Sequence, residues 1–302
     1  MSLSGAERPS RLDRLGGAGL TIAVEPLSTT EPGLGALPRC GRVASVKLSR
    51  TFFMFEAKTV AVIVPAYREE RLIARMLSRV PRFVDAVYVV DDASDDRTLE
   101  QAQSLGDERV RTVRHDRNRG VGAAIASGYR RALEDGFQVL VVMAGDDQMD
   151  PGDLPGLVAP VARGQADYVK GNRFQHPLSR RMPLHRRWGG RALSLLTRVT
   201  SGLDVDDCQC GYTVLSAHAA RELPLGELWP RYGYPNDLLL MLAARGMRVS
   251  EVPVRPVYAD EKSGVRPWHL FSVAGVILRH ALRDRDLLAP GLTRSLPQHE
   301  AR

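Results

Sequence analysis

Between Gln138 and Pro151 the sequence reads QVLVVMAGDDQMDP, and this stretch constrains the fold more than any other. Its apolar run, Val139 to Met143, has no polar alternation, which is typical of a central parallel strand covered on both faces. Three aspartates follow it: Asp146, Asp147 and Asp150. Open α/β sheets bind ligands at the carboxyl ends of such strands. The stretch predicts either a ligand site, with oxygen ligands suited to a divalent cation, or a solvated acidic turn.

Strands and helices alternate along the middle of the chain. Apolar runs predict strands at 60–64, 86–90, 110–113, 138–143 and 166–169, and helical periodicity predicts helices at 69–80, 98–105, 123–133 and 154–162. This rhythm indicates the α/β class, with a mostly parallel sheet and crossover helices. Further helices are expected at 188–200 and 237–244. A strand at 250–258 contains two prolines and is expected at a sheet edge.

The chain of 302 residues is long enough for one large domain or two small ones. Residues 1–57 lack sustained periodicity and are predicted to be a disordered extension. Because folding signals begin at Met54, we expect this residue to be the natural start. The folded domain is expected at 58–262, and an amphipathic helix and tail at 263–302.

Composition narrows the class of protein. Hydrophobic residues make up 44% and charged residues 25% of the chain, as in soluble globular proteins. The three cysteines are Cys40, Cys208 and Cys210. They form neither a disulfide framework nor a zinc-ligand set, which indicates a reducing compartment.

The net charge of +7 is concentrated in one region. Between Tyr168 and Leu203 there is no Asp or Glu, while eight basic residues occur: Lys170, Arg173, Arg180, Arg181, Arg186, Arg187, Arg191 and Arg198. Such a patch suits phosphate groups on a lipid, a nucleotide or nucleic acid. The alternative is a solvated loop face.

Apolar windows in this sequence are shorter than the ~18 to 20 residues that a membrane-spanning helix needs. The segment Pro267 to Arg283 mixes Trp, Phe, Val and Ile with Arg and His. It predicts either a helix in a membrane interface or a helix docked on the domain or on a partner subunit.

Seven motifs occur in one order: VIVPAYREE, VVDDASDDRT, NRGVGAA, MAGDDQMDP, KGNRF, DCQCGYT and YPNDLLL. Together they resemble the inverting family 2 glycosyltransferases, in particular the polyprenyl-phosphate (dolichyl-phosphate) mannosyl- and glucosyltransferase branch, over about residues 58–262. The resemblance implies a GT-A fold: a Rossmann-like nucleotide-binding domain with a mostly parallel sheet and helices on both faces.

The resemblance also implies the residues that bind the nucleotide sugar. They are Pro65, Ala66, Tyr67, Glu69, Asp91, Asp92, Asn118, Gly122 and Asp146. Of the two adjacent aspartates, Asp92 is expected to meet the base, since a carboxylate accepts hydrogen bonds from a base N–H. The alternative for Asp92 is a helix cap. For Gly122 it is an ordinary turn into a helix.

Related enzymes carry Asp-x-Asp-x-Gln after the central strand, where it holds Mg²⁺ or Mn²⁺ against the diphosphate. In this chain Ala144 replaces the first aspartate. The resemblance therefore implies metal binding through Asp146 and Gln148, with support from Asp150. Loss of one anionic ligand should weaken binding of the free ion and leave much of the coordination to the diphosphate.

Three residues are expected to act on the acceptor side. Arg173, which lies with Lys170 in KGNRF, could steer the leaving diphosphate or an acceptor phosphate. Asp237 and Asp207 could orient the acceptor or, for a hydroxyl acceptor, serve as general base. The alternatives are a helix cap for Asp237 and a loop residue for Asp207.

The leading expectation is transfer of a sugar from a GDP-mannose or UDP-glucose type donor to a polyprenyl phosphate with inversion, at the inner face of the cell membrane. One alternative is a hydroxyl acceptor in cell-envelope glycan synthesis. Another is a nucleotide-sugar-binding protein without activity, because of Ala144. Nucleic acid is not an expected partner, since charge alone suggests it and no recognition motif accompanies it. A nucleotidyltransferase would share the sheet, but this sequence lacks a glycine-rich pyrophosphorylase signature near the first strand.

Overall fold

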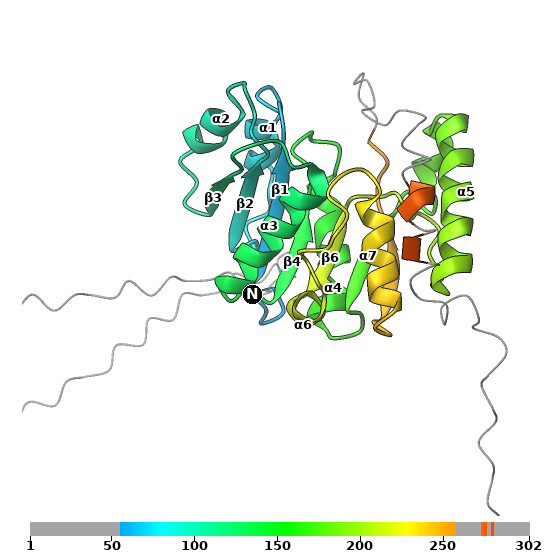
Figure 1. Ribbon diagram of the computed structural model, residues 1–302. Coiled ribbons are helices and arrows are strands. Elements are labelled where there is room, and N and C mark those ends of the chain that lie inside the picture. Colours follow the sequence, from blue (N-terminus) through cyan, green and yellow to red (C-terminus); the bar gives the residue numbers. More distant parts are fainter. Residues whose placement is uncertain (1–54, 258–272, 277–278, 281–302) are drawn as a thin grey trace, which may run out of the picture. The chain divides into compact units, whose positions relative to one another are not determined.

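The computed structural model describes residues 55–257, 273–276 and 279–280, and the domain is built on a seven-stranded sheet (Figure 1). The strands are β1 Val60–Ala66, β2 Ala86–Asp91, β3 Val110–Arg114, β4 Val139–Val142, β5 Tyr168–Asn172, β6 Thr213–Ser216 and β7 Val249–Pro253. Their order is β3-β2-β1-β4-β6-β5-β7. The predicted α/β class is confirmed.

One strand was not predicted. β6 lies antiparallel between β4 and β5, whereas all other pairs are parallel. A strand of four residues is too short to show a clear hydrophobic period, so the sequence pattern does not predict it. β7 lies at the sheet edge, as its prolines predict.

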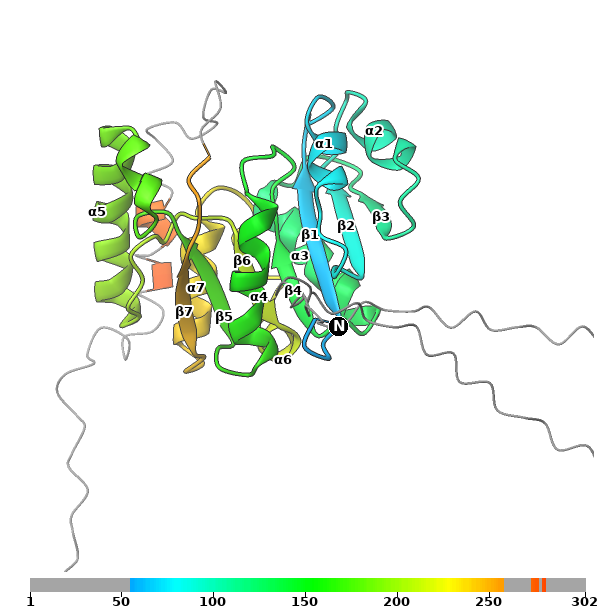
Figure 2. The same ribbon diagram turned by 180° about the vertical axis from the view of Figure 1, so that it is seen from behind.

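Helices cover both faces of the sheet (Figures 1 and 2). They are α1 Ile73–Ser78, α2 Thr98–Ser104, α3 Val121–Glu134, α4 Leu154–Ala162, α5 Leu184–Ser201, α6 Ala217–Glu222 and α7 Tyr234–Ala243. Two short 3-10 helices are η1 Pro151–Asp153 and η2 Pro177–Arg181. One core cluster joins α3, α6 and α7 to the sheet, and a second joins α1, α2 and α4. Alternate residues of each strand supply the two clusters, as the pleat requires.

Four helices begin at other residues than the sequence predicts; α3 begins at Val121 instead of residue 123, and α5 begins at Leu184 instead of residue 188. α1 begins at Ile73 and not at residue 69, because the backbone N–H of Glu69 donates to the Thr98 hydroxyl at 2.7 Å and holds a loop there. α7 begins at Tyr234, before Asp237, with Pro235 in its first turn, where its missing N–H costs nothing.

The terminal segment lies against the domain where it is described. Val273 and Val276 are buried, and Val273 packs with Leu240 of α7 and Leu193 of α5. Of the two predictions for Pro267 to Arg283, docking on the domain therefore holds for the described part. The rest of that helix, and residues 1–54 of the predicted extension, lie outside the described residues. Within the described part of the chain, no helix has the length and hydropathy to cross a bilayer.

Close packing of α3 on β1 gives a test of the fold. A Cβ at Gly128 would lie 2.3 Å from Cγ2 of Ile63, a stiff β-branched side chain. We expect Gly128→Ala to lower the free energy of unfolding by about 2 kcal/mol through overpacking. Gly189→Ala in α5, where a Cβ meets nothing within 4 Å, is the matched control. Urea unfolding of both variants measures the difference, and equal stabilities would contradict the packing.

Candidate active site

The carboxyl ends of β1 to β5 lie at one edge of the sheet, the upper edge in Figure 1. β5 joins this set because it is antiparallel to β6, which is itself antiparallel to β4. The backbone N–H of Asp92 donates to Ala66 O, and that of His115 to Asp91 O, both at 2.9 Å. The loops that carry the predicted motifs are therefore neighbours. Ligands of open α/β sheets bind at such an edge.

The loop after β1 is fastened to the loop after β2. Arg68 N donates to Ser94 Oγ at 3.1 Å, beside the bond from Glu69 to Thr98. Pro65 and Ala66 are the last residues of β1. Tyr67, which follows them, is 41% exposed. An aromatic ring with this exposure can stack on a base.

Asp92 is occupied by the protein itself. Its Oδ1 lies 2.7 Å from His115 Nδ1 and accepts from Arg119 N at 2.8 Å, and its Oδ2 accepts from Gly120 N at 2.7 Å. The residue is only 3% exposed. Asp92 therefore fixes the loop after β3, which contains the exposed Asn118. It does not cap the following helix, and its predicted contact with a base stays a prediction.

Asp91 offers the acceptor that Asp92 lacks. Its Oδ1 accepts from Ser94 N at 3.2 Å. Its Oδ2 is buried, receives no hydrogen bond from any described residue, and lies 3.5 Å from Arg114 Nε. Because a buried carboxylate oxygen without a hydrogen bond is unfavourable, a ligand N–H or hydroxyl would stabilise it. Asp91 is itself 0% exposed, and the predicted nucleoside contacts of Asp91 and Asp92 both stay predictions.

Gly122 has a packing reason for being glycine. A Cβ there would lie 2.0 Å from Trp229 O, and Gly122 N donates to Pro230 O at 2.9 Å. The start of α3 therefore sits directly on the backbone of the segment before α7. The predicted nucleotide contact of Gly122 stays a prediction.

Two aspartates of the acidic motif are bound by arginines. Asp147 accepts from Arg75 Nε at 2.7 Å and from Arg79 Nη1 at 2.8 Å, both on α1 or directly after it. Asp150 pairs with Arg255 Nη1 at 3.1 Å and accepts from Gly152 N at 2.9 Å. These ion pairs anchor the loop after β4 on either side of Gln148.

Asp146 and Gln148 lie in one turn of this loop, where Gln148 N donates to Asp146 Oδ1 at 3.1 Å. A Cβ on the preceding Gly145 would lie 3.5 Å from Glu69 Cγ and 3.6 Å from Ala66 Cβ. The turn therefore adjoins the loop after β1. Its carboxylate and amide oxygens are ligand types that suit Mg²⁺ or Mn²⁺. No group of three His, Cys, Asp or Glu within the described ranges could hold a metal alone.

At the end of β5, Arg173 and Asp207 form a bidentate ion pair. Arg173 Nε lies 2.7 Å from Asp207 Oδ2, and Nη2 lies 2.9 Å from Oδ1. Burial of Asp207 acts to raise its pKa, but the Arg173 guanidinium outweighs this and the pKa is lowered. Glu251 accepts from Asp207 N at 2.9 Å, and burial raises its own pKa. The buried Lys170 donates to Cys210 O. Arg173 is thus the basic side chain of its motif that reaches the surface.

Asp237 lies in the first turn of α7 and is 1% exposed. Its Oδ2 accepts from Trp229 N at 2.7 Å, and its Oδ1 lies 2.6 Å from His280 Nε2. Asp237 therefore joins three parts of the chain: α7, the segment before it and the terminal segment. Like Asp207, it has internal partners for both oxygens.

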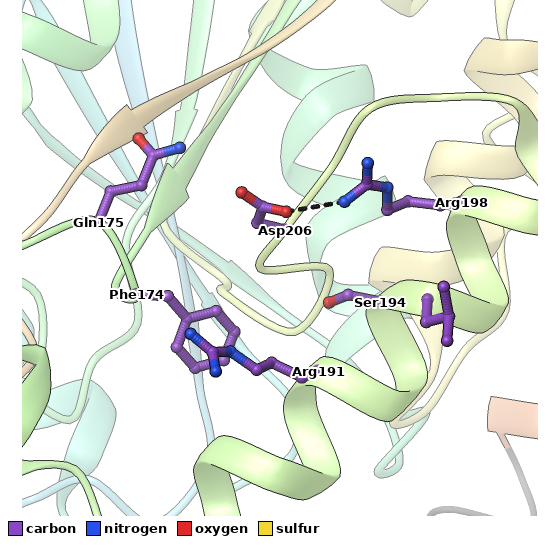
Figure 3. A pocket seen from close by; sticks show the side chains of 7 residues that line it. Phe174, Gln175, Arg191, Ser194, Arg198 and Asp206 are labelled. Atoms are coloured by element: carbon purple, nitrogen blue, oxygen red, sulfur yellow. Dashed lines mark hydrogen bonds and ion pairs between the residues drawn. The ribbon is translucent and has the colours of Figure 1, made fainter.

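Beside the Arg173 ion pair is a pocket of about 530 Å³ (Figure 3). Its lining comes from the segment after β5, from the residue before Asp207 and from α5: Phe174, Gln175, Arg191, Ser194, Leu195, Arg198 and Asp206. The Arg191 guanidinium lies 5.7 Å from the centre of the Phe174 ring, and Arg198 Nη1 lies 3.0 Å from Asp206 Oδ1. Arg198 is also paired with Asp204, so Arg191 is the guanidinium of this pocket that has no carboxylate partner among the described residues, and it suits an anionic ligand.

Several of these residues were not predicted from the sequence. The links of His115 to Asp92 and of Glu251 to Asp207 join residues 23 and 44 positions apart, which no local pattern reveals. Arg191 and Arg198 belong to the basic region of the sequence. Their spacing of seven residues places them on one face of a helix, and this is the sequence signal that could have indicated a shared pocket.

An α/β sheet whose carboxyl edge brings together Tyr67, Asp91 and an acidic turn is the arrangement of a nucleotide-sugar-dependent glycosyltransferase with a GT-A fold. Residues 61–223 match glycosyl transferase family 2. The chain belongs to this family, and the predicted family and fold are confirmed. It is a glycosyltransferase.

Similar proteins include lipid-phosphate glycosyltransferases. The chain is 28% identical, over 67% of its length and 87% of the relative's, to a UDP-N-acetylglucosamine–dolichyl-phosphate N-acetylglucosaminyltransferase of Methanococcus voltae. It is 33% identical to an undecaprenyl-phosphate mannosyltransferase of Micrococcus luteus, over 65% and 82% of the two chains. A solved structure of Mycobacterium tuberculosis glucosyl-3-phosphoglycerate synthase with Mn²⁺, UDP and phosphoglyceric acid has a TM-score of 0.57 at 22% identity, over 74% and 78% of the chains.

The Arg173–Asp207 pair predicts a dependence of stability on pH. Because the folded-state pKa of Asp207 is lowered, the stabilisation is present above the unfolded-state pKa and is lost as the pH falls through the folded-state value. Asp207→Asn should cost about 3 kcal/mol at neutral pH, since it leaves Arg173 without its charge partner. The cost should shrink below about pH 4. Denaturant unfolding across this range measures it, and the exposed Asp204→Asn is the control. A cost independent of pH would contradict this account.

Proposed function

We propose that this glycosyltransferase moves a hexose from a nucleoside-diphosphate sugar of the GDP-mannose or UDP-glucose type to a polyprenyl phosphate of the dolichyl type, with inversion at C1. The observation that carries the choice of acceptor is the state of the two carboxylates expected to act as base. Asp207 is paired with Arg173, and Asp237 is held by Trp229 and His280. Both are buried.

An acceptor for this enzyme should therefore not need a base. A phosphate monoester has a second pKa of ~6 and is largely dianionic at neutral pH, so its oxygen attacks C1 without losing a proton. A hydroxyl would have to give its proton to a carboxylate that is within reach. The internal partners of Asp207 and Asp237 thus favour the phosphate, and the names of the two curated relatives agree with it.

On the donor side, Tyr67 would stack on the base and Asp91 would accept hydrogen bonds from the base or ribose. Asp146 and Gln148 would hold Mg²⁺ or Mn²⁺ on the diphosphate. When bound, the cation neutralises charge that develops on the leaving β-phosphate. With a single carboxylate in the turn, the cation should bind tightly only together with the nucleotide.

On the acceptor side, Arg173 follows β5 at the carboxyl edge of the sheet, and Asp207 holds its guanidinium in one orientation. The neighbouring Phe174 lines the pocket of Figure 3, where Arg191 is a further cationic group. An acceptor phosphate would lie near Arg173, at the mouth of this pocket. Such an acceptor is anchored in a bilayer, so the enzyme would work as a peripheral protein at the inner face of the cell membrane.

The test is incubation of the purified protein with labelled GDP-mannose, UDP-glucose or UDP-N-acetylglucosamine and a polyprenyl phosphate, with Mn²⁺ or Mg²⁺ and with chelator. We expect labelled lipid from one donor and loss of product with chelator. Product formed only on a hydroxyl acceptor would show that the acceptor belongs to the alternative class. Tight nucleotide binding with no product on any acceptor would favour a binding protein.

Substitutions separate chemistry from structure. Asp146→Asn should lower kcat/KM by about 100-fold or more with little change in stability, since it removes the anionic metal ligand of the turn.

Asp237→Asn should lower the free energy of unfolding by about 2 kcal/mol, because it weakens the hydrogen bonds of a buried carboxylate, and it should leave kcat of the folded enzyme nearly unchanged. Steady-state kinetics and urea unfolding of both variants test this. A large loss of kcat in Asp237→Asn without loss of stability would identify it as a base.

A further inference from the structure

The helix α5 presents its apolar residues away from the domain. Four of its residues are among the large hydrophobic side chains that the structure exposes: Trp188 at 70%, Leu195 at 63%, Leu196 at 39% and Val199 at 66%. Trp188, Leu195 and Val199, together with the exposed Ala192, recur at helical spacing and therefore form one stripe. The other exposed large hydrophobics of the described chain, Tyr67, Leu105 and Tyr232, lie singly in other elements.

The inner face of α5 is polar instead. Ser194, Thr197 and Thr200 are buried. Ser194 Oγ accepts from Cys208 N at 3.1 Å, and Thr197 Oγ1 accepts from Asn236 Nδ2 at 2.7 Å. A helix exposed to water normally has the opposite arrangement, with apolar residues inside. This inverted arrangement predicts that the outer face of α5 is not surrounded by water when the protein works.

The charges beside the stripe indicate what covers it. Arg180, Arg187 and Arg191 precede or flank the stripe, and none of the three forms an ion pair with a described residue. A two-fold contact with a second copy of the chain would bring these like charges together. Anionic lipid headgroups would neutralise them, and a Trp at one end of the stripe suits the headgroup region.

We propose that α5 is a docking helix that lies in the interface of an anionic bilayer, with Trp188, Leu195 and Val199 inserted and the arginines among the headgroups. In Figures 1 and 2, α5 lies at the margin of the domain, beyond α7 and β7. The pocket of Figure 3 opens along its flank, because Arg191, Leu195 and Arg198 line it. The proposal deepens the proposed function, since a polyprenyl phosphate reaches the site only from a bilayer.

The experiment is co-sedimentation of the full chain with vesicles of phosphatidylglycerol and phosphatidylcholine in equal parts, and with phosphatidylcholine alone. We expect binding to the anionic vesicles that weakens with salt. The double variant Trp188→Ser, Val199→Ser should bind the anionic vesicles more weakly, by a factor of about ten or more, because two apolar side chains no longer enter the interface. Leu105→Ser, an exposed leucine at the end of α2, is the matched control and should bind like the natural sequence.

Equal binding of the double variant and the natural sequence overturns the proposal. So does a double variant that changes from a dimer to a monomer in light scattering while its vesicle binding is unaltered, since the stripe would then be a contact between copies. Thermal unfolding checks that the double variant is folded. We expect it to fold like the natural sequence, because both substituted side chains are exposed.

Activity separates this proposal from the proposed function. With a polyprenyl phosphate embedded in vesicles, the double variant should lose most of its turnover, whereas with a short-chain, water-soluble polyprenyl phosphate it should match the natural sequence. Loss on both acceptors to the same degree contradicts a docking role. If the natural sequence transfers no sugar to either acceptor yet binds anionic vesicles through α5, the proposed acceptor is wrong and the docking helix stands.

Discussion

Buried carboxylates hold the loops of the ligand edge in place. A charge can remain in the interior only if hydrogen bonds or an opposite charge compensate its lost hydration. Asp92 meets this condition with His115 and two backbone N–H groups of the loop after β3, and Asp207 meets it with Arg173. Asp237 does so with Trp229 N and His280. Each carboxylate therefore fixes one loop relative to the sheet, and the shape of the site follows.

This use of carboxylates also limits the chemistry. Asp207 and Asp237, which the motifs predict as acceptor-side residues, have internal partners for both oxygens, whereas Asp146 is partly exposed in the turn after β4. The distribution suits a reaction in which the protein binds and neutralises phosphates and removes no proton from the acceptor. It also gives a physical reason for tolerance of Ala144: a diphosphate brings its own anionic oxygens to the metal. Asp147 and its two arginines hold the loop after β4 against α1.

Local patterns were enough to predict the first four strands, the helices between them and the edge position of β7. Each has its own apolar period or its own prolines. β6 was missed because four residues carry no period, and its neighbours in the sheet are far away in sequence. Partners were missed for the same reason: Arg75 and Asp147 are 72 positions apart. The internal partners of Asp92 were missed because adjacent residues at a strand end point in different directions, and only tertiary contacts show what each one meets.

Hydrogen bonds through residues 207–208 connect α5, the proposed docking helix, to Arg173, the residue proposed to meet the acceptor phosphate. Ser194 of α5 accepts from the backbone of Cys208, the residue next to Asp207, and Asp207 holds Arg173. Polar residues on the inner face of α5 are therefore needed to fix the helix against this segment, and the apolar residues are left for the outer face. A bilayer that contacts α5 would contact an element joined by hydrogen bonds to the segment that holds Arg173, the group proposed to meet the acceptor phosphate. The inverted helix would thus meet two requirements of the proposed function together: a polar junction with the site and an apolar contact with the lipid.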